Sequence, residues 1–207
     1  MSGPDGWTVI VPVKPSAIGK SRLAGVGVDR EALARAIALD TIEAAAAVAT
    51  VVVVTDDAGV TEAAQAMAGV RVVPEGPTRG LNAAIATGAA SVGVDVPRAA
   101  LLGDLPALRP GDLSAALESA ASVHRAVVAD AEGTGSTLVT ARAGVTWETA
   151  FGAESFAQHL ARGCVALEIP DASTLRRDVD TVAQLTAAAA LGVGPRTAAL
   201  LGGRALA

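Results

Sequence analysis

Short apolar runs alternate with longer alanine-rich segments along most of the chain. Five runs of β-branched and aliphatic residues predict buried strands at 7–13, 51–55, 70–73, 99–102 and 126–129. The segments between them, with larger apolar residues spaced among alanines, predict helices at 30–49, 59–68 and 113–122 and one that opens near Gly80. Such alternation is typical of a mostly parallel sheet with helices on both faces, so we expect an α/β three-layer sandwich.

The last third of the chain departs from this regular alternation. The pattern predicts an antiparallel strand at 138–141, a helix at 155–162, a strand at 165–169 and a closing helix at 182–191. In open sheets of this kind, ligands bind beyond the carboxyl ends of the strands. Charged residues at or just after predicted strand ends therefore mark one rim of the sheet: Lys14, Lys20, Arg22, Asp56, Asp104 and Asp130.

Length and composition limit the class of protein. The 207 residues suit a single domain, 1–207, whose 51% hydrophobic share comes mostly from small side chains. No run reaches the roughly 18 apolar residues of a membrane span, and residues 1–6 lack a signal-peptide pattern. A lone cysteine, Cys164, excludes an internal disulfide. We expect a cytoplasmic protein in which Cys164 is a buried structural thiol.

The formal net charge of -5, without a long basic stripe, argues against a nucleic-acid partner or a membrane surface. His124 and His159 have no neighbours at metal-ligand spacing, and we expect them in a loop and on a helix surface. The cations Lys14, Lys20 and Arg22 fall in one loop after the first strand, which suggests a phosphate clamp; a solvated basic loop is the alternative. It is no P-loop, because Lys14 stands where the first glycine belongs.

Three further motifs lie in the segments after predicted strands. Gly80 permits close backbone approach and Asn82 offers an amide to a base edge, although both also suit an ordinary helix start. Asp104 follows a buried strand and precedes Pro106, which is the setting of a magnesium ligand between protein and triphosphate or, alternatively, of a loop cap. Asp178 and Asp180, at i and i+2, would share one face of an extended segment, which suits metal binding. The alternative is that Asp180 caps the next helix, and the two roles are compatible.

A loop rich in glycine and hydroxyl groups, 130–137, is followed by Phe151-Gly152 and a predicted helix start at Ser155. Hydroxyls and amides at Thr137, Gly152 and Ser155 suit a small phosphate or carboxylate, whereas an ordinary flexible hairpin is the alternative. Asp130 is either a third metal ligand or a turn residue, and the sequence does not choose between them.

Taken in order, these motifs resemble the phosphoenolpyruvate and 2-phospho-L-lactate guanylyltransferase family of coenzyme F-420 biosynthesis. The resemblance runs from 11–14 and 20–23 through 80–82, 103–106, 133–137 and 151–156 to 178–181. It implies a glycosyltransferase-A-like nucleotidyltransferase fold that uses GTP and a phosphorylated three-carbon acid. It also implies Mg²⁺ at Asp104, Asp178 and Asp180, and the acceptor at Thr137, Gly152 and Ser155.

The reaction that we expect is attack by the acceptor phosphate on the α-phosphorus of GTP, with release of pyrophosphate. A phosphate ester is ionised near neutral pH, so no general base is needed. In this interpretation Asp104, Lys20 and Arg22 carry the chemistry, while Lys14, Lys20, Arg22, Gly80 and Asn82 bind GTP.

Phosphoenolpyruvate is the acceptor that we favour. The alanine-rich, lysine-poor composition resembles that of actinobacterial proteins, and the resemblance to the family implies phosphoenolpyruvate as the usual acceptor there. The alternatives are 2-phospho-L-lactate, 3-phosphoglycerate, a molybdopterin or sugar-phosphate nucleotidyltransferase, and, in another class, a non-catalytic nucleotide-binding regulator. The number of metal ions and the oligomeric state, for which a homodimer is one alternative, stay open at this point.

Overall fold

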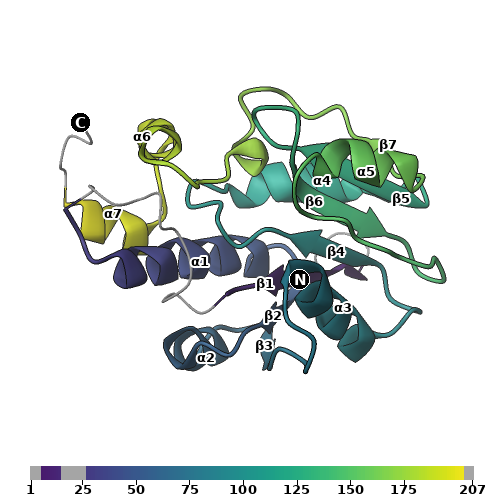
Figure 1. The fold of residues 1–207 in the computed structure, drawn as a ribbon, viewed down its shortest axis with the longest axis horizontal. Coiled ribbons are helices and arrows are strands. Elements are labelled where there is room, and N and C mark those ends of the chain that lie inside the picture. Colours follow the sequence, from purple (N-terminus) through teal and green to yellow (C-terminus); the bar gives the residue numbers. More distant parts are fainter. Residues whose placement is uncertain (1–5, 15–26, 203–207) are drawn as a thin grey trace.

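The computed structural model describes residues 6–14 and 27–202, in which strands form one central sheet with helices on both faces (Figure 1). The strand order is β3-β2-β1-β4-β6-β5-β7. The strands are β1 (Thr8–Pro12), β2 (Thr50–Val54), β3 (Val70–Val73), β4 (Arg98–Leu101), β5 (Arg125–Ala129), β6 (Ser136–Ala141) and β7 (Val165–Ala166). The helices are α1 (Arg30–Ala46), α2 (Ala58–Gln65), α3 (Leu81–Val92), α4 (Pro110–Ala120), α5 (Ser155–Ala161), α6 (Val182–Leu191) and α7 (Pro195–Leu201), with a short 3-10 turn η3 (Thr174–Arg176).

The prediction of an α/β sandwich with a mostly parallel sheet is confirmed. Strands β3, β2, β1 and β4 pair in parallel, and β6 is antiparallel to both β4 and β5, as its position in the sequence predicted. Successive residues of a strand point to opposite faces. Val9 and Val11 accordingly pack with α1, α2 and α4, while Ile10 packs against α3 on the other face.

Small side chains permit close approach between these layers. A Cβ atom on Gly88 of α3 would lie 2.5 Å from a methyl carbon of Ile10, so that the helix could not keep its distance from β1 with a larger residue there. The alanine-rich and valine-rich composition therefore has a direct structural use.

The C-terminal region differs from its prediction. The helix at 182–191 has the predicted bounds but does not close the fold, because α7 follows it, and the predicted strand at 165–169 is reduced to the two residues of β7. The buried carboxylate of Asp40 in α1 accepts hydrogen bonds from the backbone N–H groups of Arg196 (3.1 Å) and Thr197 (2.8 Å). Figure 1 shows α6 and α7 together on the left, with α7 beside α1. This long-range cap leaves no local signal in the sequence.

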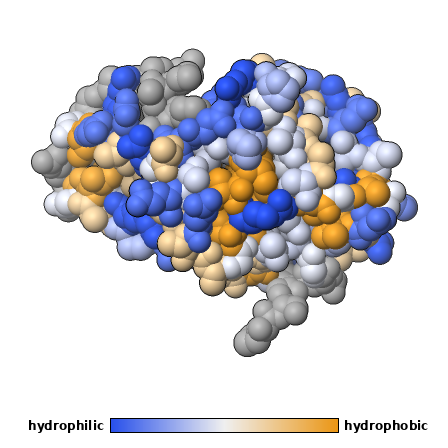
Figure 2. All heavy atoms as spheres, turned by 90° about the horizontal axis from the view of Figure 1, so that it is seen from below, coloured by the Kyte–Doolittle hydropathy of each residue, from blue (hydrophilic) through white to orange (hydrophobic). Residues whose placement is uncertain are grey.

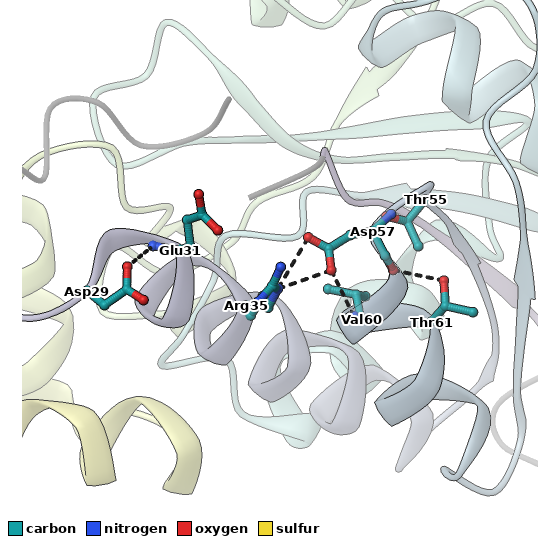
Figure 3. Close-up of polar contacts among 7 residues, drawn as sticks. All are labelled: Asp29, Glu31, Arg35, Thr55, Asp57, Val60 and Thr61. Atoms are coloured by element: carbon teal, nitrogen blue, oxygen red, sulfur yellow. Dashed lines mark hydrogen bonds and ion pairs between the residues drawn. The ribbon is translucent and has the colours of Figure 1, made fainter. Parts of the chain in front are cut away.

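A second buried acid fixes the start of α2. Asp57 is the N-cap and accepts from the backbone N–H of Val60 at 3.0 Å, while Arg35 of α1 binds the same carboxylate at 3.1 Å (Figure 3). Its own backbone N–H donates to the Thr55 hydroxyl at 3.0 Å. Asp57 therefore locks α2 against α1, and its role is structural.

The described helices are too short or too polar to cross a membrane. On the face of the molecule in Figure 2, hydrophobic areas are interspersed with hydrophilic ones.

Candidate active site

A cavity of about 840 Å³ opens beyond the carboxyl ends of β1 and β4. It is lined by the segments that follow β1, β4 and β5, by residues 151–155 and by Asp178 and Asp180. Of the predicted rim residues in the described ranges, Lys14, Asp104 and Asp130 line this cavity. Asp56 does not line it; it forms an ion pair with Arg79 at 2.5 Å, and this hydrogen bond lowers the pKa of Asp56.

Asp104 is placed by the turn that ends β4. A Cβ atom on Gly103 would lie 3.2 Å from the Pro12 carbonyl oxygen, so that the turn passes close to β1. The backbone N–H of Leu105 donates to the buried Thr41 hydroxyl of α1 at 3.1 Å. These contacts fix the backbone on both sides of Asp104 at the wall of the cavity.

The segment with Asp178 and Asp180 is attached directly to this turn. The backbone N–H of Val179 donates to the Asp104 carbonyl at 3.0 Å, and the Val179 side chain is fully buried. The two flanking carboxylates then line the cavity, as the i and i+2 spacing predicted. The alternative that Asp180 caps the next helix is wrong, because Thr181 is the N-cap of α6 and forms a capping box with Gln184.

Crowding of carboxylates changes the pKa of Asp178. Burial, followed by the negative charges of Asp104, Asp130 and Asp180, raises this pKa to about 7. Its Oδ1 atom is buried without a hydrogen-bond partner among the described residues. We call these four residues, Asp104, Asp130, Asp178 and Asp180, the acidic end of the cavity; it is suited to a positively charged ligand.

Asp130 organises the turn that follows β5. Its two carboxylate oxygens accept the backbone N–H groups of Thr134 (3.0 Å) and Gly135 (2.7 Å). A Cβ atom at Gly135 would lie 2.2 Å from Asp130 Oδ2, so that only glycine fits here. Carboxylate oxygens of Asp130, Glu132 and Asp178 also lie within 4.8 Å of one another, a spacing that could hold a metal ion. Of the two roles considered for Asp130, the turn role is present; Glu132 was missed, because it lies in a loop without a strand signal.

Ser136, Gly152 and Ser155 also line the cavity, and we call these three residues the hydroxyl end of the cavity. Gly152 has φ 139° and the helix cap Glu154 has φ 53°, so that the backbone turns sharply before α5. Ser155, the first residue of α5, is buried and donates its backbone N–H to the Gly152 carbonyl at 3.2 Å. Gly152 and Ser155 were predicted to meet at one site, and they do.

Thr137 directly follows Ser136 but is not among the lining residues that the structure describes. It is fully buried in β6, and its hydroxyl has no hydrogen-bond partner within the described ranges. Its predicted contact with the acceptor therefore stays a prediction.

His159 supports the hydroxyl end from behind, and the prediction of a helix-surface position for it is wrong. It is fully buried on α5, where its Nδ1 lies 3.0 Å from the Ser136 hydroxyl oxygen and its Nε2 accepts the Ala150 backbone N–H at 2.8 Å. Burial lowers the pKa of His159 to about 4. The ring also packs edge-on against Phe151 at 5.0 Å between centroids. Sequence periodicity could not reveal this, because α5 is short and covers its inner face with polar residues.

Asn82 holds the same loop from another side. Its amide oxygen accepts the Phe151 backbone N–H and its amide nitrogen donates to the Phe151 carbonyl, both at 2.9 Å. Gly80, with φ 116°, precedes α3 as its N-cap, and the next residue, Leu81, lines the cavity. Neither Gly80 nor Asn82 is among the lining residues described, so their contact with GTP stays a prediction.

Two of the three clamp cations, Lys20 and Arg22, lie outside the described residues. Lys14 lies two residues beyond the end of β1 and is exposed at the cavity wall. Cys164 is buried, as predicted, and burial raises the pKa of its thiol. It does not line the cavity in the part of the chain that the structure describes.

The architecture of the chain is a nucleotidyltransferase-like fold. A putative nucleotide-diphospho-sugar transferase from Desulfovibrio desulfuricans G20 is similar in structure, with a TM-score of 0.69 over 97% of this chain and 96% of that protein, at 18% identity. At such identity the likeness concerns the fold, and it confirms the nucleotidyltransferase-like architecture predicted from the sequence.

Residues 7–201 match the family described as "Guanylyl transferase CofC like", and the chain belongs to this family. It is 51% identical to a phosphoenolpyruvate guanylyltransferase from Thermomonospora curvata over 94% of this chain and 88% of that protein. It is 50% identical to a protein of the same name from Salinispora arenicola, over 95% and 94% of the two chains. The resemblance inferred from the motifs is thus confirmed, and the chain is a guanylyltransferase.

Proposed function

We propose that this enzyme transfers the GMP unit of GTP to phosphoenolpyruvate, giving enolpyruvyl-diphospho-guanosine and pyrophosphate in coenzyme F-420 biosynthesis. The observation that carries the proposal is a single cavity lined by both the acidic end and the hydroxyl end. One end suits a cation-bound triphosphate and the other a small anion. The names of the relatives supply the acceptor.

The acceptor phosphate carries its own negative charge near neutral pH and attacks the α-phosphorus of GTP directly. A new bond forms between that phosphorus and an acceptor oxygen, and the bond to the β-phosphate oxygen breaks, so that pyrophosphate leaves with its electron pair. No side chain has to remove a proton. The work of the protein is therefore to align two anions and to offset their repulsion.

The acidic end fits a divalent cation. The fit is supported by the Oδ1 atom of Asp178, which is buried and has no hydrogen-bond partner among the described residues. Burial and the neighbouring carboxylates raise the pKa of Asp178 to about 7. We assign Mg²⁺ to Asp104, Asp178 and Asp180, since hard cations prefer carboxylate oxygens. Glu132 and Asp130 extend the set of available oxygens next to Asp178. When bound, Mg²⁺ would neutralise negative charge on the triphosphate.

The chain's own cations and amides complete the assignment. Lys14 at the cavity wall, together with Lys20 and Arg22, binds the phosphates of GTP, and the start of α3 at Gly80 and Asn82 contributes to the nucleotide side. Thr137, Gly152 and Ser155 receive the phosphorylated acid.

The test is a transfer assay with GTP labelled in its α-phosphate, offered phosphoenolpyruvate, 2-phospho-L-lactate and 3-phosphoglycerate in parallel. We expect labelled product of the mass of the enolpyruvyl adduct, one pyrophosphate released per product, and little use of CTP. Transfer only to another acceptor would overturn the choice of acceptor. GTP binding without pyrophosphate release would overturn catalysis.

A further inference from the structure

Ser136 owes its orientation to a bulge in the pairing of β5 with β6. Farther along β6, Leu138 packs on the face covered by α1 and α4, and Val139 packs with Phe151 on the other face. Strict alternation would place Ser136 on the same face as Leu138. The register shifts between Val128 and Ala129, however, and pairs Ser136 with Ala129, so that the Ser136 side chain meets His159 of α5 instead.

The second contact of His159 determines which ring nitrogen carries the proton. The Ala150 backbone N–H can only donate, and it donates to Nε2 at 2.8 Å. Nε2 therefore carries no hydrogen, and a neutral ring must carry its hydrogen on Nδ1. Burial lowers the pKa of His159 to about 4, so the ring is neutral near pH 7. A hydrogen bond with the Ser155 backbone opposes this shift, as donation by a ring N–H would.

The tautomer of His159 in turn determines whether the Ser136 hydroxyl donates or accepts in the hydrogen bond between them. Because Nδ1 donates, the Ser136 hydroxyl oxygen, 3.0 Å away, accepts. Within the described residues the structure gives the hydroxyl proton no acceptor, and Ser136 lines the cavity together with Gly152 and Ser155. A carboxylate or phosphate oxygen, which can only accept, is the matching partner for it.

We propose that Ser136 is a further acceptor-binding residue, which donates its O–H to an anionic oxygen of the phosphorylated acid, and that His159 is the positioning residue that fixes this polarity. The inference rests on the proposed function for the identity of the ligand. It adds a residue that the motifs did not single out. It also gives the bulge of β6 a use, because a regular strand would direct the hydroxyl to the other face.

The first experiment is Ser136→Ala, measured by steady-state kinetics with both substrates varied. We expect the KM for phosphoenolpyruvate to rise about 10- to 100-fold, as for loss of one hydrogen bond to a charged group, with the KM for GTP unchanged. Thr140→Val is the matched control, because it removes a buried hydroxyl from the same strand away from the cavity. Equal effects of the two changes, or an equal rise in both KM values, would overturn the inference.

Two changes at His159 separate its two contacts. An asparagine amide can take the place of Nδ1 and donate to Ser136, whereas a glutamine amide reaches the place of Nε2 and accepts from Ala150. Both lose the ring packed on Phe151, so we expect similar losses of stability. His159→Asn is expected to keep the KM for phosphoenolpyruvate within a few fold, and His159→Gln to raise it as Ser136→Ala does. The same KM in both variants would contradict the proposed polarity.

Two direct measurements separate this inference from the proposed function. Nitrogen-15 NMR of the imidazole rings reports the tautomer, and His124→Gln assigns the signals, since the chain has 2 histidines. A proton on Nε2 of His159 would overturn the inference whatever the activity. Calorimetric titration with phosphoenolpyruvate then compares wild type with Ser136→Ala. Wild type that binds this acid without transferring GMP refutes only the proposed function, whereas unchanged binding by Ser136→Ala refutes the inference.

Discussion

At the acidic end of the cavity four carboxylates crowd together, and burial and their charges raise the pKa of Asp178 to about 7. At the hydroxyl end hydrogen bonds hold the polar groups in place: His159 binds Ser136 and Ala150, and Asn82 binds both backbone groups of Phe151. The repulsion between carboxylates at the acidic end is unfavourable, and a bound cation would reduce it. The hydrogen bonds of the hydroxyl end, in contrast, are formed before any ligand binds. Chemistry and recognition are thus supported by opposite electrostatic arrangements within one cavity.

The largest effect is expected when the acidic end loses a charge. Asp178→Asn should lower kcat by about 10³-fold, because a ligand of the proposed cation is gone. The same change should raise the free energy of unfolding, measured by urea titration in a chelator at pH 8, by on the order of 2 kcal/mol, since it removes a buried, repelled charge. Asp104→Asn serves as a second variant, for which turnover should fall far more than stability. Normal turnover in either variant would remove that residue from the proposed site.

When no metal is bound, a rise in pH should change the stability contributions of the two ends of the cavity in opposite directions. The pKa of Asp178 is raised from 3.8 to about 7, so its contribution to stability is present at low pH and is lost as pH rises through this window. The pKa of His159 is lowered from 6.5 to about 4, so its contribution is present above pH 6.5 and is lost as pH falls toward 4, by about 3 kcal/mol in total.

Denaturant titrations of wild type, Asp178→Asn and His159→Gln from pH 4 to 8 in a chelator give the free energy of unfolding of each protein against pH. The differences between these curves isolate the contributions of Asp178 and His159. As pH rises, the free energy of unfolding of wild type should fall relative to that of Asp178→Asn. Over the same range it should rise relative to that of His159→Gln. Parallel curves for all three proteins would contradict both assignments.

The hydroxyl end is disturbed most simply at Asn82. Asn82→Ala leaves the N–H and carbonyl groups of Phe151 without their partners and should cost about 2 kcal/mol of stability. We expect a rise in the KM for the acceptor, together with a rise in the KM for GTP from loss of the Asn82 amide, and little change in metal dependence, measured by magnesium titration of activity. Asn82→Asp is the matched control, because it can still accept from the Phe151 N–H but cannot donate to the carbonyl. If metal dependence changed as much as acceptor binding, the two ends would not be separable.

The smallest effects on activity are expected when a single lysine that is proposed to bind GTP is removed. Lys14→Ala and Lys20→Ala should each raise the KM for GTP about tenfold, because each removes one charge near the triphosphate while others stay in place. The KM for phosphoenolpyruvate should not change. A variant with unaltered GTP kinetics would exclude its lysine from the clamp.

The sequence predicted the acidic end better than the hydroxyl end, for a physical reason. Strand termini, Pro106 and the i and i+2 spacing of Asp178 and Asp180 are local signals, and parallel strands bring such termini to one edge. His159 and Asn82 act through contacts with residues far away in the sequence. The local sequence around an isolated histidine or a helix-start asparagine does not indicate which residue it contacts. The same holds for α7, whose cap is the distant Asp40.

The sheet itself followed from the apolar runs, including the antiparallel β6, because buried strands need little beyond β-branched composition. The bulge before Leu138 did not follow, since one extra residue in a loop rich in glycine and hydroxyl groups produces no distinct pattern. Its effect on Ser136 emerges only from the register of the paired strands.

The hydrogen bond from Val179 to the Asp104 carbonyl has a consequence for how the protein folds. It joins two segments that lie far apart in the chain, so that the acidic end does not exist until the C-terminal region has docked on the sheet. The docking step also brings Asp178 toward like charges and works against their repulsion. We expect this to be a late and slow stage of folding that divalent cations accelerate, so that a newly made chain gains its capacity for transfer only after the rest of the sheet is in place.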